Sequence, residues 1–93
     1  NVTINGGNGN DTINLKGTIG GNLTVLGGLG DETVNVTGAL DVGGALTVAG
    51  GAGSNDFLMT AKAIIGGSAA LSGINELTLN ANKLEVGTNL TVS

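Results

Sequence analysis

Six residues near the start of the chain combine backbone freedom with a carboxylate. Residues 6–11 read Gly-Gly-Asn-Gly-Asn-Asp, and residues 12–15 then alternate between polar and apolar side chains. Glycines allow a turn to fold tightly, and a carboxylate beside exposed carbonyl oxygens supplies the oxygen ligands that Ca²⁺ prefers. The stretch therefore predicts either a calcium site or a tight corner within a repeated structure.

The acidic residue of this turn recurs in altered form further along the chain. Asp11 is replaced at equivalent positions by Glu32 and then by Asn55, and Asp31 directly precedes Glu32. Stacked repeats would bring the first two turns within one strand spacing, about 4.8 Å. Asp11, Asp31 and Glu32 are therefore the candidate Ca²⁺ ligands. Because the glycines persist while the carboxylate drifts, we favour the alternative, a structural corner whose polar residues face water.

The sequence lacks the residues on which catalysis and nucleic-acid binding usually depend. The chain has no His, Cys, Trp or Tyr, its three basic residues are scattered lysines, and its formal net charge is −4. Carboxylates without a converging basic or aromatic partner do not make a hydrolytic cleft, and phosphate binding needs Lys or Arg. We therefore expect no enzymatic activity, no required cofactor and no nucleic-acid partner. The apolar runs are too short for a membrane-spanning helix.

An internal repeat organises the whole chain. Similar segments begin at residues 1, 22, 45, 68 and 89, which gives steps of 21, 23, 23 and 21 residues. A repeat of this length is typical of a solenoid, in which each unit buries its apolar face on its neighbours. We predict one domain over residues 1–93, with coils at about 1–21, 22–44, 45–67 and 68–88, and a further coil beginning at 89–93.

Each repeat contains short stretches that alternate with period two, separated by glycine-rich turns. No window shows the 3.6-residue period of a helix, and a β-sandwich would not require the same sequence at every step. The predicted fold is all-β: a right-handed parallel β-helix of about four coils, with three short strands per coil and no evident caps.

Aligning the repeats predicts which side chains stack in the core. Inward-pointing apolar residues should form two columns on the first strand of each coil, and these columns would hold together successive coils or successive copies. They are Val2, Leu23, Leu46 and Leu90, with Ala69 between the last two, and Ile4, Val25, Val48, Leu71 and Val92. Threonines between these columns should point outward.

Two resemblances add expectations about function. The turn at residues 6–15 resembles the G-G-x-G-x-D-x-U-x nonapeptide of the RTX (repeat-in-toxin) calcium proteins, matching at Gly6, Gly7, Gly9, Asp11 and Ile13, although this chain carries one such turn per coil instead of two. Over its whole length the chain resembles the β-strand-repeat regions of bacterial secreted and surface proteins. That second resemblance implies a self-associating extracellular filament, adhesin shaft or matrix protein.

The predicted function is therefore structural, through stacking of β-coils within one chain or end to end between copies, outside the cell. A calcium-dependent β-roll binding module is the alternative. An ice-binding protein is a minor one, suggested by the outward threonines and weakened by Ala70, which interrupts their row. Asn22 and Asn35 each begin an Asn-x-Thr glycosylation sequon on a face predicted to point outward.

Overall fold

The computed structural model describes residues 1–79 and 84–93, which form eleven β-strands and no helix. The first sheet contains one short strand from each coil: β1 (Val2–Asn5), β3 (Leu23–Leu26), β5 (Leu46–Ala49), β8 (Ala69–Ser72) and β11 (Leu90–Val92). The second sheet contains the returning strands: β2 (Asp11–Ile19), β4 (Glu32–Val42), β6 (Asp56–Met59), β7 (Ala63–Ile65), β9 (Glu76–Leu79) and β10 (Leu84–Val86).

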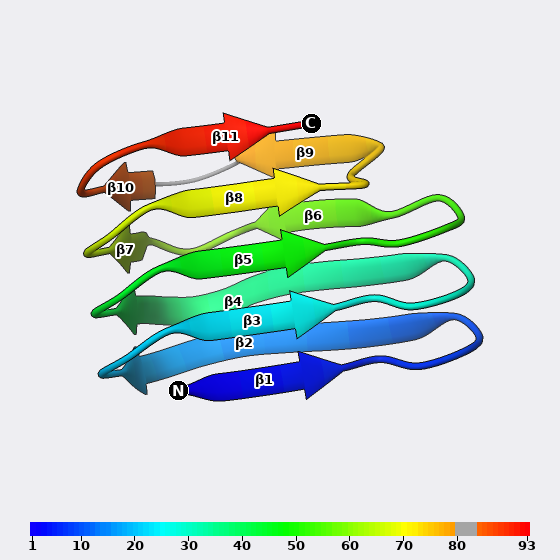
Figure 1. Ribbon diagram of the computed structural model, residues 1–93, viewed down its shortest axis with the longest axis horizontal. Helices are drawn as coiled ribbons and strands as arrows, with labels where there is room; N and C mark the ends of the chain where they lie inside the picture. The colour runs from blue at the N-terminus through cyan, green and yellow to red at the C-terminus, as the bar shows by residue number, and fades with distance from the viewer. Residues whose placement is uncertain (80–83) are drawn as a thin grey trace.

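The chain winds between the two sheets and climbs by one strand per turn. In Figure 1 the strands of the first sheet run in one direction, those of the second sheet run back, and the two termini lie at opposite ends of the stack. Every strand pair is parallel. These features confirm the predicted fold class, a parallel β-solenoid of stacked coils.

The register between coils follows the sequence repeat. Val2 pairs with Leu23, Leu23 with Leu46, and Leu46 with Ala69, which in turn pairs with Leu90. The neighbouring column runs in the same way from Ile4 through to Val92. Because side chains alternate across a strand, this register places like residues above one another on both faces of the sheet.

The number of strands per coil differs between the two halves of the solenoid. In the first two coils the second and third predicted strands join into the long strands β2 and β4, whereas β6 and β7 are separate. The β2–β4 register shifts between Leu15 and Gly17, so the second coil accommodates its two extra residues within a continuous strand. In the third coil the backbone leaves the strand at Thr60, whose Oγ1 hydroxyl donates to the Val36 carbonyl at 3.0 Å.

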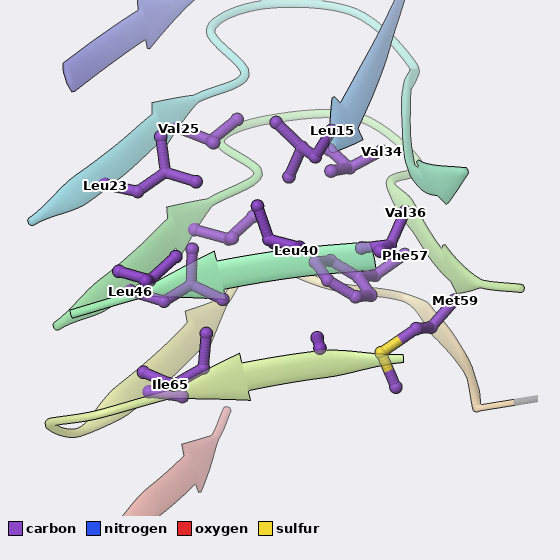
Figure 2. Packing of buried hydrophobic residues seen from close by; sticks show 14 of the residues in the cluster. Leu15, Leu23, Val25, Val34, Val36, Leu40, Leu46, Phe57, Met59 and Ile65 are labelled. Carbon is purple, nitrogen blue, oxygen red and sulfur yellow. The ribbon is translucent and has the colours of Figure 1, made fainter. Parts of the chain in front are cut away.

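The core is a narrow apolar interior between the two sheets. Figure 2 shows Leu23, Val25 and Leu46 from the first sheet lying opposite Val36, Leu40 and Phe57 from the second. Leu23, Val25, Val36 and Val42 are fully buried, and Phe57, the single aromatic residue of the chain, is 3% exposed. Branched aliphatic side chains of similar size therefore repeat from coil to coil and fill most of the interior, with Phe57 as its one aromatic residue.

Glycines at the corners permit the coils to stack closely. Gly28 has a φ of 87°, and a Cβ atom built on it would overlap the carbonyl oxygen of Gly7 in the coil below. The same conflict recurs one coil further, between Gly51 and the Gly28 carbonyl oxygen. The repeated glycine is thus required both by the left-handed backbone and by the close approach of neighbouring turns.

The apolar columns extend to both end coils of the structure. Val2, Leu90 and Val92 are 41%, 45% and 47% exposed, whereas Leu46 and Val48 in the middle are 2% and 1% exposed.

No helix that could span a membrane is present in residues 1–79 and 84–93.

Candidate functional site

A column of polar side chains lies inside the solenoid, beneath the glycine-rich turns. Its members, which we call the polar column, are Asp11, Glu32 and Asn55. Asp11 pairs with Glu32 in register, and Asn55 Oδ1 accepts the backbone N–H of Glu32 at 3.1 Å. Glu32 and Asn55 are each only 1% exposed. Asp11 and Glu32 are the first residues of β2 and β4, and Asn55 directly precedes β6.

The amide at the upper end of the polar column is fully engaged. Asn55 Nδ2 donates to the carbonyl oxygens of Gly51 at 3.2 Å and Gly73 at 2.9 Å. Its backbone N–H donates to Asn75 Oδ1 at 2.8 Å. Burying a polar group is tolerated when its hydrogen bonds are replaced inside the protein, and Asn55 meets that condition.

The two carboxylates of the polar column are not engaged in the same way. Both Oε1 and Oε2 of Glu32 are buried without a hydrogen-bond partner, as is Oδ2 of Asp11. Each carboxylate lies against a glycine that leaves room for it. A Cβ on Gly27 would lie 2.8 Å from Glu32 Oε1, and one on Gly6 would lie 3.0 Å from Asp11 Oδ2. The same two Cβ positions also lie close to the carbonyl oxygens of Gly50 and Gly27, respectively, so a turn carbonyl neighbours each carboxylate.

Burial and nearby negative charge change the protonation equilibrium of Glu32. Burial raises the pKa of the Glu32 carboxyl above its ordinary value of 4.5, and the negative charges of Asp11 and Asp31 raise this pKa further. Loss of hydration disfavours the charged form, and like charges nearby act in the same direction. The polar column can therefore be neutralised either by a proton or by a cation.

The third candidate ligand, Asp31, lies on the other side of the chain. Its Oδ1 accepts the backbone N–H of Ser54 at 2.8 Å, and its own N–H donates to Asn10 Oδ1 at 3.0 Å. Successive residues of an extended chain point in opposite directions, so Asp31 and Glu32 cannot face the same point. The structure thus brings Asp11 and Glu32 together and separates Asp31 from them. No group of three acidic, His or Cys side chains placed to hold a metal ion occurs in the described part of the chain.

Outward asparagines form a second set of links between coils. Asn22 Oδ1 accepts the N–H of Ala45 at 2.8 Å, as Asn1 Oδ1 accepts the N–H of Asn22 at 3.0 Å. On the second sheet, Asn35 Nδ2 donates to Asn14 Oδ1 at 3.3 Å. The two asparagines of the predicted glycosylation sequons, Asn22 and Asn35, therefore both contribute side-chain hydrogen bonds to the stacking of coils.

The outer surfaces of the two sheets differ in charge. The outward side chains of the first sheet carry no charge, and we call this surface the neutral face; it consists of Thr3, Asn5, Thr24, Leu26, Thr47, Ala49, Ala70, Ser72 and Thr91. Every charged side chain in the described part of the chain lies on a strand of the second sheet, between two such strands, or, for Asp31, directly before one. Lys62 Nζ and Glu85 Oε2 form an ion pair there at 3.7 Å.

The sequence alone did not single out Asn55 as part of the site. The repeat alignment places Asn55 at the position of Asp11 and Glu32, and strict alternation from the inward residue Phe57 makes that position inward. The signal was therefore present, as a polar residue at an inward position of a strand.

Comparison of the chain with protein-family models, curated proteins and solved structures found no match.

Proposed function

We propose that this chain is a structural protein that forms, or belongs to, a rigid extracellular fibre, filament or adhesin shaft built from stacked β-coils. The observation that carries the proposal is the coil-to-coil register. Apolar inward residues recur at the same strand position in every coil from Val2 to Leu90. A surface that already matches the coil above it matches an added coil equally well, because each coil contacts only its neighbours.

The end coils support this proposal further. Val2, Leu90 and Val92 belong to the inward columns, yet 41% to 47% of their surface is exposed. Their strands β1 and β11 each pair with one neighbour, so each has an edge of free backbone groups. Edges of this kind pair readily with another strand of matching register. Further coils of the same chain, or the end coil of a second copy, would cover both the edges and the apolar side chains.

The proposal is tested by placing one charge on the end coil in two orientations. Val2→Asp puts a carboxylate into the inward column, whereas Thr3→Asp puts it on the outer surface of the same strand. Light scattering should show long assemblies for the parent chain and for Thr3→Asp, and their loss in Val2→Asp. A parent chain that stays a monodisperse monomer at high concentration would rule out end-to-end stacking of copies.

A calcium-dependent β-roll is the second candidate, and the unpartnered carboxylates of the polar column favour it. Asp11 and Glu32, with carbonyl oxygens of the adjoining turns, would hold the ion, and Asp31 would take no part. Calcium supplies positive charge where the chain itself offers none, and it accepts six to eight oxygen ligands. A ligand that binds only the folded state raises its stability.

Thermal melts with calcium and with chelator test this candidate. Calcium should raise the melting temperature of the parent chain and of Asp31→Asn, and it should have no effect on Glu32→Gln. Identical melts of the parent chain in calcium and in chelator would reject the candidate while leaving the structural proposal untouched.

A further inference from the structure

The neutral face is distinguished by what it lacks. Its five strands contribute outward side chains that are small or uncharged, from Thr3 on β1 to Thr91 on β11. The acidic residues that give the chain its net charge of −4 lie elsewhere in the described structure, on the second sheet and its connecting segments. Two copies that approach through any surface containing the second sheet therefore bring like charge together, which is unfavourable.

The neutral face is also regular along the solenoid axis. Thr3, Thr24 and Thr47 pair directly with one another in successive strands, so their hydroxyl and methyl groups repeat at the strand spacing of about 4.8 Å. A second surface with the same spacing can repeat each contact at every coil. Small side chains such as threonine, alanine and serine also let two sheets approach and interdigitate.

The neutral face lacks the groups that other classes of partner would contact. Phe57, the one aromatic residue, is buried in the core, so no ring is available on this face to stack against a sugar. A charged polymer or an anionic lipid surface would find no countercharge. The partner that matches both the neutrality and the spacing is the neutral face of a second copy of this chain.

We propose that the neutral face is a lateral interface, through which two solenoids pack sheet against sheet with their charged second sheets pointing away. The proposal goes beyond end-to-end stacking and rests on the solenoid geometry and on the distribution of charge between the two sheets. It adds a direction of assembly: coils extend a shaft along its axis, and neutral faces join shafts side by side.

The size of the face determines how strong this association is. Strands of three or four residues and five strands give a face of roughly 13 by 24 Å, or roughly 300 Å². A stable interface buries about 800 Å² on each partner. A single 93-residue chain should therefore pair only transiently, and a shaft with about three times as many coils should pair stably.

Transient pairing is measured by cross-linking, because the chain contains no cysteine of its own. Thr47→Cys places one thiol at the middle of the neutral face, and Thr12→Cys places one on the outer surface of the second sheet as a matched control. Both positions are exposed. Treated with the oxidant diamide at equal concentration, Thr47→Cys should form disulfide-linked dimers at least tenfold faster than Thr12→Cys.

A second experiment places a charge on the neutral face. Adding Thr24→Glu to Thr47→Cys should slow its cross-linking several-fold, whereas adding Thr12→Glu instead should leave the rate nearly unchanged. End-to-end stacking keeps the two Thr47 positions roughly five strand spacings apart, about 24 Å, so it cannot produce these dimers. Equal rates for Thr47→Cys and Thr12→Cys would overturn the proposal, and shaping of ice crystals by unassociated chains would assign the neutral face to ice instead.

Discussion

Asn55 accepts the backbone N–H of Glu32 through its Oδ1 at 3.1 Å, and the two side chains occupy the same inward position in successive coils. The side-chain amide of Asn55 donates hydrogen bonds to the carbonyl oxygens of Gly51 and Gly73. The side-chain oxygens of Glu32 have no hydrogen-bond partner, and an ionised carboxylate has no proton to donate to the carbonyls of the turns. We therefore expect the same position to stabilise the third coil and to weaken the second.

Replacing Glu32 with glutamine should raise the stability of the chain at pH 7. Glu32→Gln removes a buried carboxyl whose oxygens have no hydrogen-bond partner and introduces an amide that can donate to the turn carbonyls, as Asn55 does. The measurement is the melting temperature in buffer containing EDTA. Glu76→Gln is the matched control, because Glu76 is exposed and should change the melting temperature little. A lower melting temperature for Glu32→Gln than for the parent chain would contradict this interpretation.

The stability of the parent chain should fall as pH rises above about 4.5, the ordinary pKa of this carboxyl. Below that pH, the Glu32 carboxyl is protonated in both the folded and the unfolded chain, so it does not lower the free energy of unfolding. Above it, the unfolded chain releases the proton while the folded chain retains it, because burial and the neighbouring Asp11 and Asp31 raise the pKa of Glu32 in the folded state. Stability therefore declines until the pH exceeds the folded-state pKa, and is constant beyond it.

Urea denaturation of the parent chain and of Glu32→Gln at several pH values isolates this effect. The difference in stability between the two proteins should widen from pH 4.5 upward, at constant ionic strength and without metal. Curves that stay parallel over the whole range would show that Glu32 titrates alike in the folded and unfolded chains.

Truncating one member of an inward column should be costly. Leu46 is 2% exposed and pairs with Leu23 below and Ala69 above. Leu46→Ala leaves a cavity and should lower the free energy of unfolding by about 2–5 kcal/mol. Thr47→Ala, the neighbouring outward position on the same strand, should cost about 1 kcal/mol or less. Equal losses at the two positions, measured by urea denaturation, would contradict the inward and outward assignment.

A side chain on Gly28 should destabilise the stack of turns. Gly28→Ala adds a methyl group at a φ of 87° and against the carbonyl oxygen of Gly7. The backbone strain alone is worth about 1–3 kcal/mol, and the overlap adds to it. Gly20→Ala is the control, since its φ is not positive and no atom lies within 4 Å of the added Cβ. If both variants unfold at the same urea concentration, the glycines of the turns are not required by stacking.

Much of the fold follows directly from the repeat. Once residues 22–25 are aligned with residues 1–4, the pairing of Val2 with Leu23 and of Ile4 with Val25 is determined, because parallel strands in successive coils have to keep inward residues inward. The merging of strands in β2 and β4 could not be predicted in this way. It depends on how the backbone absorbs two extra residues near Gly38, which the structure does through a register shift between β2 and β4 that the repeat alone does not specify.

The candidate site was predicted only in part. Alignment correctly indicated that Asp11 and Glu32 stand above one another, and the structure places them in register. Grouping Asp31 with them overlooked the alternation of the strand, which turns Asp31 outward to accept the N–H of Ser54. The lack of hydrogen-bond partners around Glu32 needed coordinates, since it depends on which carbonyl groups the glycine turns direct inward.

The central claim, that β-coils stack along the axis of an extended shaft, is tested most directly by electron microscopy and fibre diffraction of the assembled protein. We predict long, unbranched objects whose strand repeat of about 4.8 Å runs parallel to the long axis. Dispersed 8.9 kDa monomers at high concentration, or fibres with that repeat in another direction, would contradict the account.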